Sequence, residues 1–297
     1  YINNSVLYSE RNARGSKSPG KLSAIPLSVT EGSTREALIC VDCVRLTANE
    51  SKLAEKEVRE TLKHVAAAVK DYPAMSKQML RVRAALKKSA AIVPASRTSH
   101  NDSLEFISWM LDDHFTFLGY EKYCINRKTG SPSIELQGKS PLGVSKFKTG
   151  IKPKVKLSDL SMGARDLILK KKICNFAKSG TRSKVHRPAY CDYVLIKEFD
   201  SNGEVSVEHR FLGLYTSSVY FQEVLEIPLL RRKVQAVLEL SGFAQNGHNI
   251  KDLLQVINVF PRDELFQISR SQLLHTSTEI ARIQGLRTSR LFIRRDL

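Results

Sequence analysis

The sequence lacks the features that define several large classes of protein. No stretch reaches the eighteen uninterrupted apolar residues of a membrane span, which excludes an integral membrane protein. The opening residues, YINNSVLYSE, contain neither the basic nor the apolar segment of a signal peptide. They also lack an initiator Met, so we expect the chain to be a piece of a longer protein.

Motifs for nucleotide binding and for common hydrolytic chemistry are also missing. There is no GxGxxG, no GxxxxGK[ST], no HExxH and no GxSxG. The seven histidines are dispersed singly, without the spacing of metal ligands, and a lone His is usually structural or solvated. The residues alone therefore predict a binding or scaffolding module with no catalytic, cofactor-binding or metal-binding residue in this chain.

Five scattered cysteines predict no disulfide framework. Cys40 and Cys43 form a CxxC pair, a spacing used by zinc and redox sites, but no second CxxC or HxxxH accompanies them. They lie in ALICVDCVRL, which is typical of a half-buried strand, where positions three apart point to opposite faces. We interpret them as strand residues of a protein in a reducing, cytoplasmic setting.

Length and pattern predict two domains of the α+β class. The chain has 297 residues, and its 42% hydrophobic content can fill a core. Residues 11–35 are predicted to be an exposed loop, and Ala37–Leu46 a buried strand. A capping box at Thr47–Glu50 begins a helix, and Pro73 is expected to begin a second one. Residues 89–102 are predicted to be a linker at the domain boundary.

The second part combines strands with three C-terminal helices. Strands are predicted at 115–125, 173–178, 191–199 and 204–216, the last two joined as a hairpin by Asp200-Ser201-Asn202-Gly203. Helices are predicted to begin at Asp102, after Ser158, near Pro228, at Asn249 and near Ser269, the last ending at Gly285. Residues 290–297, RLFIRRDL, are predicted to form a strand. No neighbouring segment is available to pair with it as a hairpin, so we expect a following domain.

The net charge of +17 is concentrated in one region. Residues 146–187 contain thirteen Lys or Arg and two Asp, which favours a solvated basic surface, an anion or subunit contact, or a nucleic-acid surface. A nucleic-acid surface would have aromatic residues interleaved with the charge, and this region has only Phe147 and Phe176. Two other polar clusters, Asp112–His114 and Pro261–Phe266, are interpreted as a helix-end turn and as a capping or ion-pair segment.

Five segments together resemble one protein family. They are EFISWMLDDHFTFLGYEKY (105–123), SGTRSKVHRPAYCDYVLIKEFD (179–200), EHRFLGLYTSSVY (208–220), IPLLRRKVQAVLELSGF (227–243) and FPRDELFQIS (260–269). In order and approximate spacing they are similar to the N-terminal, non-catalytic region of the large bacterial-type NAD-specific glutamate dehydrogenases. The resemblance covers about residues 36–297 and is strongest from 103 onward. Lys184 and Cys191 depart from the family pattern without breaking it.

The resemblance implies a domain plan and a role in regulation. Residues 1–88 would be a partial ACT-like domain, 103–285 an intermediate α+β domain, and 286–297 the first strand of a following ACT-like domain. The whole protein would be a cytoplasmic enzyme of amino-acid catabolism that oxidises L-glutamate with NAD, a cofactor with no site in this chain. The implied partners are the downstream catalytic domains, further copies of the chain in a homo-oligomer, and an amino-acid effector under allosteric control; no membrane is implied.

One set of basic residues is the candidate effector or anion site. Ser and Thr hydroxyls with Arg side chains suit a carboxylate or a phosphate. The site is predicted in the loop after residue 178, with one residue from a later strand: Arg182, Lys184, His186, Arg187 and Arg210. Two rival hypotheses stay open, a stand-alone basic module that binds nucleic acid or another anionic partner, and a structural scaffold without a ligand.

Overall fold

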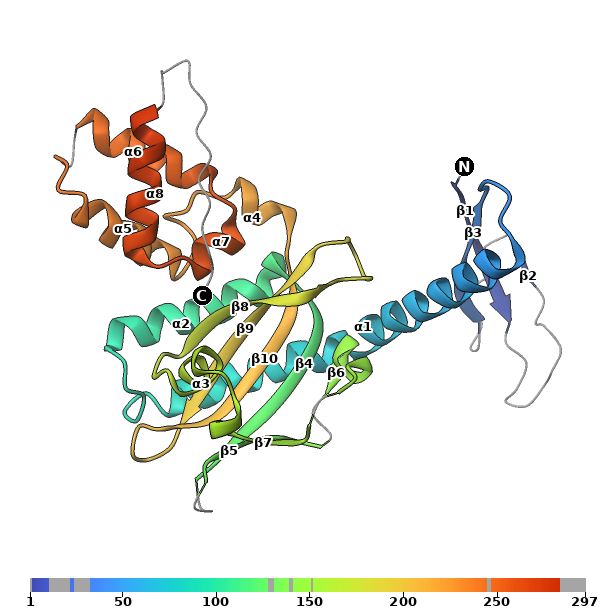
Figure 1. Ribbon diagram of the computed structural model, residues 1–297, viewed down its shortest axis with the longest axis horizontal. Coiled ribbons are helices and arrows are strands. Elements are labelled where there is room, and N and C mark those ends of the chain that lie inside the picture. The colour runs from blue at the N-terminus through green and yellow to red at the C-terminus, as the bar shows by residue number, and fades with distance from the viewer. Residues whose placement is uncertain are drawn as a thin grey trace. The chain divides into compact units, whose positions relative to one another are not determined.

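The computed structural model describes residues 2–10, 22–23, 33–127, 131–138, 141–150, 152–244 and 247–283 (Figure 1). Over these residues helices and antiparallel strands cluster rather than alternate, which confirms the predicted α+β class. The chain divides into two compact units, residues 1–58 and 59–297. The predicted loop at 11–35 falls mostly outside the described residues, and the predicted terminal strand at 290–297 falls wholly outside them.

The first unit contains a three-stranded antiparallel sheet of order β2-β1-β3. Its strands are β1 (Ile2–Glu10), β2 (Leu22–Ser23) and β3 (Ser33–Val41). Pairing between β1 and β3 ends at the Ile2–Val41 pair, and β3 ends with it. The predicted buried strand Ala37–Leu46 is therefore wrong at its C-terminal end, where Val41 is 58% and Val44 83% exposed.

The two cysteines of the CxxC pair differ in secondary structure. Cys40 lies in β3, and Cys43 lies in the segment that leads to the first helix. Both side chains are exposed, so the expectation of a half-buried strand is wrong for them. Among the described residues, no group of three His, Cys, Asp or Glu side chains is placed to hold a metal ion.

A single helix, α1 (Ala48–Lys88), replaces the two helices that the sequence predicted. The capping box is confirmed, because Thr47 N–H donates to Glu50 Oε2 at 2.8 Å and Glu50 N–H donates to Thr47 Oγ1 at 3.3 Å. Pro73 lies inside the helix instead of beginning a new one. A Pro inside a helix costs about 3 kcal/mol, and burial of the apolar stripe that follows it offsets this cost. That stripe is Met75, Met79, Val82 and Leu86.

The second unit is built on an antiparallel sheet of order β7-β5-β4-β10-β9-β8, with the short β6 paired to β4. Its strands are β4 (Phe115–Asn126), β5 (Ser133–Leu136), β6 (Leu142–Gly143), β7 (Lys154–Lys156), β8 (Cys174–Arg182), β9 (Tyr190–Phe199) and β10 (Val205–Tyr215). The β9–β10 hairpin is confirmed, and Gly203 occupies its turn with a φ of +71°. Asp200 Oδ1 accepts the N–H groups of Asn202 and Glu204, which fixes the turn.

The two faces of this sheet pack against different clusters. Phe211 of β10 belongs to the large core, which includes residues of α2 (Arg97–Trp109) and of the second half of α1 (Figure 1). The adjacent Leu212 belongs to a smaller cluster with Ala68, Val185 and Cys191. Neighbouring strand residues point to opposite faces, so the two clusters lie on opposite sides of β10. Helix α3 (Met162–Leu169) packs near the face that carries Arg210.

Two helices begin at different residues from those predicted. The N-cap of α2 is Ser96, whose Oγ accepts the N–H of Ser99 at 3.2 Å, and Asp102 instead forms an ion pair with Arg232. The N-cap of α3 is Ser161, whose Oγ accepts the N–H of Ala164. In both cases a serine in extended backbone caps the helix.

In the described part of residues 217–283, five helices follow the sheet, and the three predicted ones are confirmed. They are α4 (Ser217–Phe221), α5 (Leu230–Leu240), α6 (His248–Val259), α7 (Arg262–Gln267) and α8 (Arg270–Ile283). The capping box of α8 is present, because Ser269 N–H donates to Gln272 Oε1 and Gln272 N–H donates to Ser269 Oγ. The short helices α4 and α7 were not predicted. Within the described ranges, no helix combines the length and apolarity needed to cross a membrane.

A buried arginine and a lysine bind the ends of these helices. Arg262 is 3% exposed and donates to the carbonyl oxygens of Val219, Gln222, Asn258 and Phe260. Lys233 donates to three carbonyls near the C-terminus of α7, those of Leu265, Phe266 and Ile268. Cations in these positions satisfy carbonyl groups that have no partner within the helix.

An aromatic cluster joins the helices to the sheet. The ring of Phe266, in α7, lies 5.3 Å from Phe106 of α2, 4.8 Å from Phe176 of β8 and 5.1 Å from Tyr215 of β10, measured between centroids. Trp109 completes the cluster at 6.3 Å from Phe266. Phe266 therefore contacts α2, both strands and its own helical segment.

We expect Phe266→Ala to lower the free energy of unfolding by about 3–5 kcal/mol, because it removes a buried ring and leaves a cavity. Urea unfolding followed by circular dichroism measures the change. Phe221→Ala is the matched control, since Phe221 is 89% exposed; its effect should stay within about 0.5 kcal/mol. Equal losses for the two variants would contradict a central role for the cluster.

Candidate functional site

A bulge at the edge of the sheet shapes the region of the predicted site. β8 pairs with β9 regularly as far as Lys178 opposite Asp192, and the next pair is Arg182 opposite Tyr190. The bulged residues 179–181 have no partner in that register, which bends the strand and turns their side chains. Ser183 Oγ then donates to Val185 O at 2.8 Å and accepts the N–H of Val185 at 3.0 Å, so the start of the loop is held by local hydrogen bonds.

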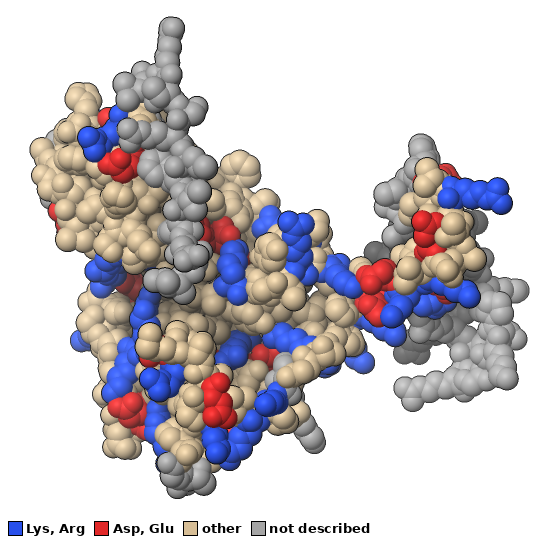
Figure 2. Space-filling view, viewed as in Figure 1, with Lys and Arg blue, Asp and Glu red and all other residues tan. Residues whose placement is uncertain are grey.

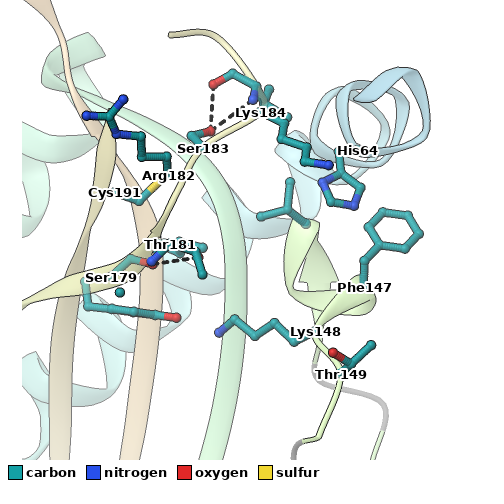
Figure 3. Close-up of a pocket in the computed structure, with 15 residues that line it drawn as sticks. His64, Phe147, Lys148, Thr149, Ser179, Thr181, Arg182, Ser183, Lys184 and Cys191 are labelled. Atoms are coloured by element: carbon teal, nitrogen blue, oxygen red, sulfur yellow. Dashed lines mark hydrogen bonds between the residues drawn. The ribbon is translucent and has the colours of Figure 1, made fainter. Parts of the chain in front are cut away.

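The first cavity, here called the basic cavity, has a volume of about 490 Å³. Figure 3 shows it between the β8 bulge and the segment around Phe147, with His64 of α1 at one side. Its lining residues are His64, Val144, residues 147–149, residues 179–185, Cys191, Tyr193 and Leu212.

Positive charge and hydroxyl groups occupy part of the wall of the basic cavity, beside apolar side chains such as Val144 and Leu212. Lys148, Arg182 and Lys184 line it, and no lining residue is a carboxylate. Lys184 lies 3.6 Å from Glu60 and Lys148 pairs with Glu121, so both lysines have acidic neighbours behind the wall. The Arg182 guanidinium lies over the ring of Tyr190, at 5.4 Å from its centroid. The cavity is thus suited to an anionic ligand.

The aromatic side of the basic cavity is the pair His64 and Phe147. Their rings are stacked with centroids 4.6 Å apart and planes 10° apart. Partial burial lowers the pKa of His64, and the nearby Lys184 ammonium lowers it further. His64 is therefore neutral at neutral pH and acts as a flat ring rather than as a cation.

The second cavity, here called the mixed-charge cavity, has a volume of about 280 Å³. It contains both signs of charge, because Lys178 bridges Asp192 at 2.7 Å and Asp263 at 2.5 Å. Arg187 donates to Tyr215 O at 3.1 Å and lies over the Tyr220 ring. The lining residues are Lys178, Arg182, residues 187–190, Asp192, Leu214, Tyr220 and Asp263.

Two polar atoms make this second cavity distinctive. Burial raises the pKa of Asp192 to about 6, although the ion pair with Lys178 opposes the rise. Arg187 Nε is buried and has no hydrogen-bond partner among the described residues. An unsatisfied buried donor costs about 1–3 kcal/mol, and this atom lies beneath the surface of the cavity that the rest of Arg187 lines.

The structure divides the five predicted site residues. Arg182 lines both cavities, Lys184 lines the basic cavity and Arg187 lines the mixed-charge cavity. His186 is exposed with a φ of +71° and lines neither of them. Arg210 lies apart in a third cavity of about 220 Å³ beside α3, where it pairs with Glu208 at 2.7 Å and covers the ring of Tyr123 at 4.1 Å.

Sequence reasoning missed the residues that come from other elements. Lys148 and Lys178 lay within the basic run of 146–187, but their acidic and aromatic neighbours come from distant segments. Asp263 belongs to the segment 261–266, for which the sequence predicts a capping or ion-pair role, and its pairing with Lys178 confirms the ion pair. Asp113 lies in a tight turn with a φ of +53°, and His114 Nδ1 lies 2.9 Å from Trp109 O, which confirms a helix-end turn.

Comparison with known proteins gives a consistent result along the chain. Residues 227–285, which contain α5 to α8, match the family model described as glutamate dehydrogenase, helical motif 1. The chain is similar to NAD-specific glutamate dehydrogenases. It is 37% identical over 277 residues to the one from Halomonas elongata, which includes 92% of this chain and 17% of the relative.

Two further relatives carry the same name. The chain is 36% identical over 301 residues to the NAD-specific glutamate dehydrogenase of Pseudomonas aeruginosa, covering 99% of this chain and 18% of that protein. It is 29% identical over 201 residues to the NAD-specific glutamate dehydrogenase of Mycobacterium tuberculosis. That match covers 68% of this chain and 11% of the relative. The chain therefore spans less than a fifth of the length of the curated relatives that it matches.

Asp192 should make stability depend on pH. Its folded pKa of about 6 exceeds the unfolded value near 3.9, so the folded state binds more protons between these values. The free energy of unfolding should then fall by up to about 3 kcal/mol from pH 4 to pH 6 through this group, and Asp192→Asn should remove that fall. Urea unfolding at pH 4, 5, 6 and 7 measures it.

Asp166→Asn provides the control, since Asp166 is exposed on α3 and lines none of the three cavities. This variant should keep the pH dependence of the original chain. If Asp192→Asn and the original chain showed the same slope between pH 4 and pH 6, the raised pKa of Asp192 would be wrong.

Proposed function

We propose that this chain is the non-catalytic N-terminal portion of an NAD-dependent glutamate dehydrogenase, with a regulatory and scaffolding role. The whole enzyme would convert L-glutamate, NAD and water to 2-oxoglutarate, ammonium and NADH, and NAD would bind in its catalytic domains. The observation that carries the proposal is the similarity over 92–99% of this chain to 17–18% of such enzymes. The match to helical motif 1 supports it independently.

The chemistry of the two main cavities fits binding better than catalysis. In the mixed-charge cavity the ammonium of Lys178 is already engaged by both carboxylates. In the basic cavity the histidine is stacked on Phe147. Neither arrangement presents a nucleophile with a base in hydrogen-bond reach.

We assign the mixed-charge cavity to an amino-acid effector. The α-carboxylate would face the side chains of Arg182 and Arg187, and the α-ammonium would face the carboxylates of Asp192 and Asp263. A zwitterion matches this arrangement because the cavity presents both signs of charge within one small volume. The cavity also adjoins helical motif 1 through Asp263, so a ligand there contacts two parts of the chain.

Regulation would follow from a difference in affinity between two states of the enzyme. A ligand shifts such an equilibrium only as far as it binds one state more tightly than the other. Contacts to both β9 and α7 provide this difference if the two elements move relative to each other. The ACT-like assignment of residues 1–88, the homo-oligomer and the cytoplasmic location belong to the same proposal.

Isothermal titration of the 297-residue chain with individual L-amino acids and with dicarboxylates tests the effector site. At least one amino acid should bind, and Arg187→Ala should weaken it about tenfold or more, as expected for a lost hydrogen bond to a charged group. Arg97→Ala, at an exposed arginine that lines neither cavity, should bind normally. Identical heats for the Arg187 variant and the original chain would overturn the site.

The rival hypothesis is a nucleic-acid module, and it predicts binding that weakens steeply with salt. We expect no shift of single- or double-stranded DNA or RNA in a gel at 50 mM salt. The reason is that much of the basic run is paired with carboxylates, as for Lys148, Lys154, Lys171 and Lys178. A salt-sensitive shift at micromolar protein would favour the rival.

A further inference from the structure

Six of the eight residues that line the third cavity are apolar or aromatic. The cavity has a volume of about 220 Å³ and lies between α3 and the strands β8, β9 and β10. β10 contributes the two charged residues, Glu208 and Arg210. The other lining residues are Ala164, Leu167 and Ile168 of α3, Ala177 of β8, and Tyr193 and Leu195 of β9. Charge is therefore confined to the β10 side of this cavity.

We propose that the third cavity binds a short aliphatic monocarboxylate, with the carboxylate at Arg210 and the alkyl chain between α3 and β9. This ligand is separate from the proposed amino-acid effector, and the inference does not depend on the dehydrogenase assignment. It rests on the juxtaposition of a guanidinium that has free donors with a wall of apolar side chains.

The guanidinium of Arg210 has hydrogen-bond donors to spare. Its Nε donates to Glu208 Oε1 at 2.7 Å, and its central carbon lies 4.1 Å from the centroid of the Tyr123 ring. Within the described ranges, neither of its two Nη groups forms a hydrogen bond or an ion pair. The side chain is 25% exposed, so a ligand can reach it. Two adjacent Nη groups match the two oxygens of a carboxylate.

The charged groups on this side carry an excess of positive charge. Glu208 accepts from Arg210, and its Oε2 lies 4.0 Å from Nζ of Lys197. Burial lowers the pKa of Lys197 to about 8, and the charges of Lys170 and Arg210 lower it further against the opposing effect of Glu208, so Lys197 is protonated at neutral pH. Two cations beside one carboxylate favour a ligand with a single negative charge.

The same arrangement disfavours an amino acid in this cavity. The side chain of Glu208 is completely buried, although part of it borders the cavity, and it offers no exposed oxygen to an α-ammonium group. The side chains of α3, β8 and β9 that line the cavity carry no carboxylate either. A ligand with a positive group would therefore bury that charge without a partner, which is costly.

Lys197 also holds the apolar wall in place. Its Nζ donates to the carbonyl oxygens of Leu167 and Lys170 at the C-terminal end of α3, which ties this helix to β9 (Figure 1). Ile168 of α3 and Leu195 of β9 are 5% and 4% exposed, so the two sides of the wall are packed. A wall that is ordered before the ligand arrives reduces the entropy lost on binding.

Titration calorimetry of the 297-residue chain with propionate, butyrate, hexanoate, adipate and hexylamine tests the proposal. Affinity should rise about fourfold for each methylene added from propionate to hexanoate, because each one is removed from water by the apolar wall. Adipate and hexylamine should bind about tenfold or more weakly than hexanoate. Adipate would place a second carboxylate against the apolar wall, and hexylamine would bring a cation to Arg210.

Two variants test the position of the site. Ala164→Leu should abolish hexanoate binding, because the larger side chain occupies the cavity, and it should leave amino-acid binding in the mixed-charge cavity unchanged. Arg210→Lys should weaken hexanoate about tenfold, because it keeps a cation beside Glu208 and removes the paired Nη donors. Ala66→Leu is the matched control and should bind hexanoate normally, since Ala66 is exposed on α1 and lines none of the three cavities.

The series of ligands uses the original chain, so it decides the proposal without relying on the fold of a variant. Circular dichroism shows whether each variant is folded. The proposal is overturned if hexanoate does not bind at millimolar concentration, or if propionate, adipate or hexylamine binds as tightly as hexanoate. Unchanged hexanoate binding by folded Ala164→Leu would also overturn it.

Discussion

The packing of Phe266 against the sheet determines how the rest of the second unit is arranged. Its ring contacts aromatic side chains from α2, β8 and β10, and its helix α7 begins at the buried Arg262. With α7 held there, Asp263 comes within 2.5 Å of Lys178. The mixed-charge cavity is therefore a consequence of an apolar contact, because one of its two carboxylates is positioned by the ring three residues later in the same helix.

Local patterns in the sequence were sufficient for elements whose ends are determined locally. The Asp200–Gly203 turn, the capping boxes at Thr47 and Ser269 and the long strands of the second unit are present as predicted. Long-range packing decided the others. Pro73 did not end α1 because the apolar stripe after it is buried in the core of the second unit, and neither the burial nor its size can be read from the stripe alone.

The candidate site was only partly predictable for a related reason. The run of basic residues between 146 and 187 is a property of the sequence, but its partners come from elsewhere: Glu121 of β4, Glu135 of β5, Glu204 in the β9–β10 turn and Asp192 of β9. Figure 2 accordingly shows Lys and Arg side chains interspersed with Asp and Glu. The count of basic residues in a stretch of sequence therefore overstates the net positive charge at the surface that this stretch forms. Arg210 is an example, because it forms an ion pair with Glu208 of its own strand.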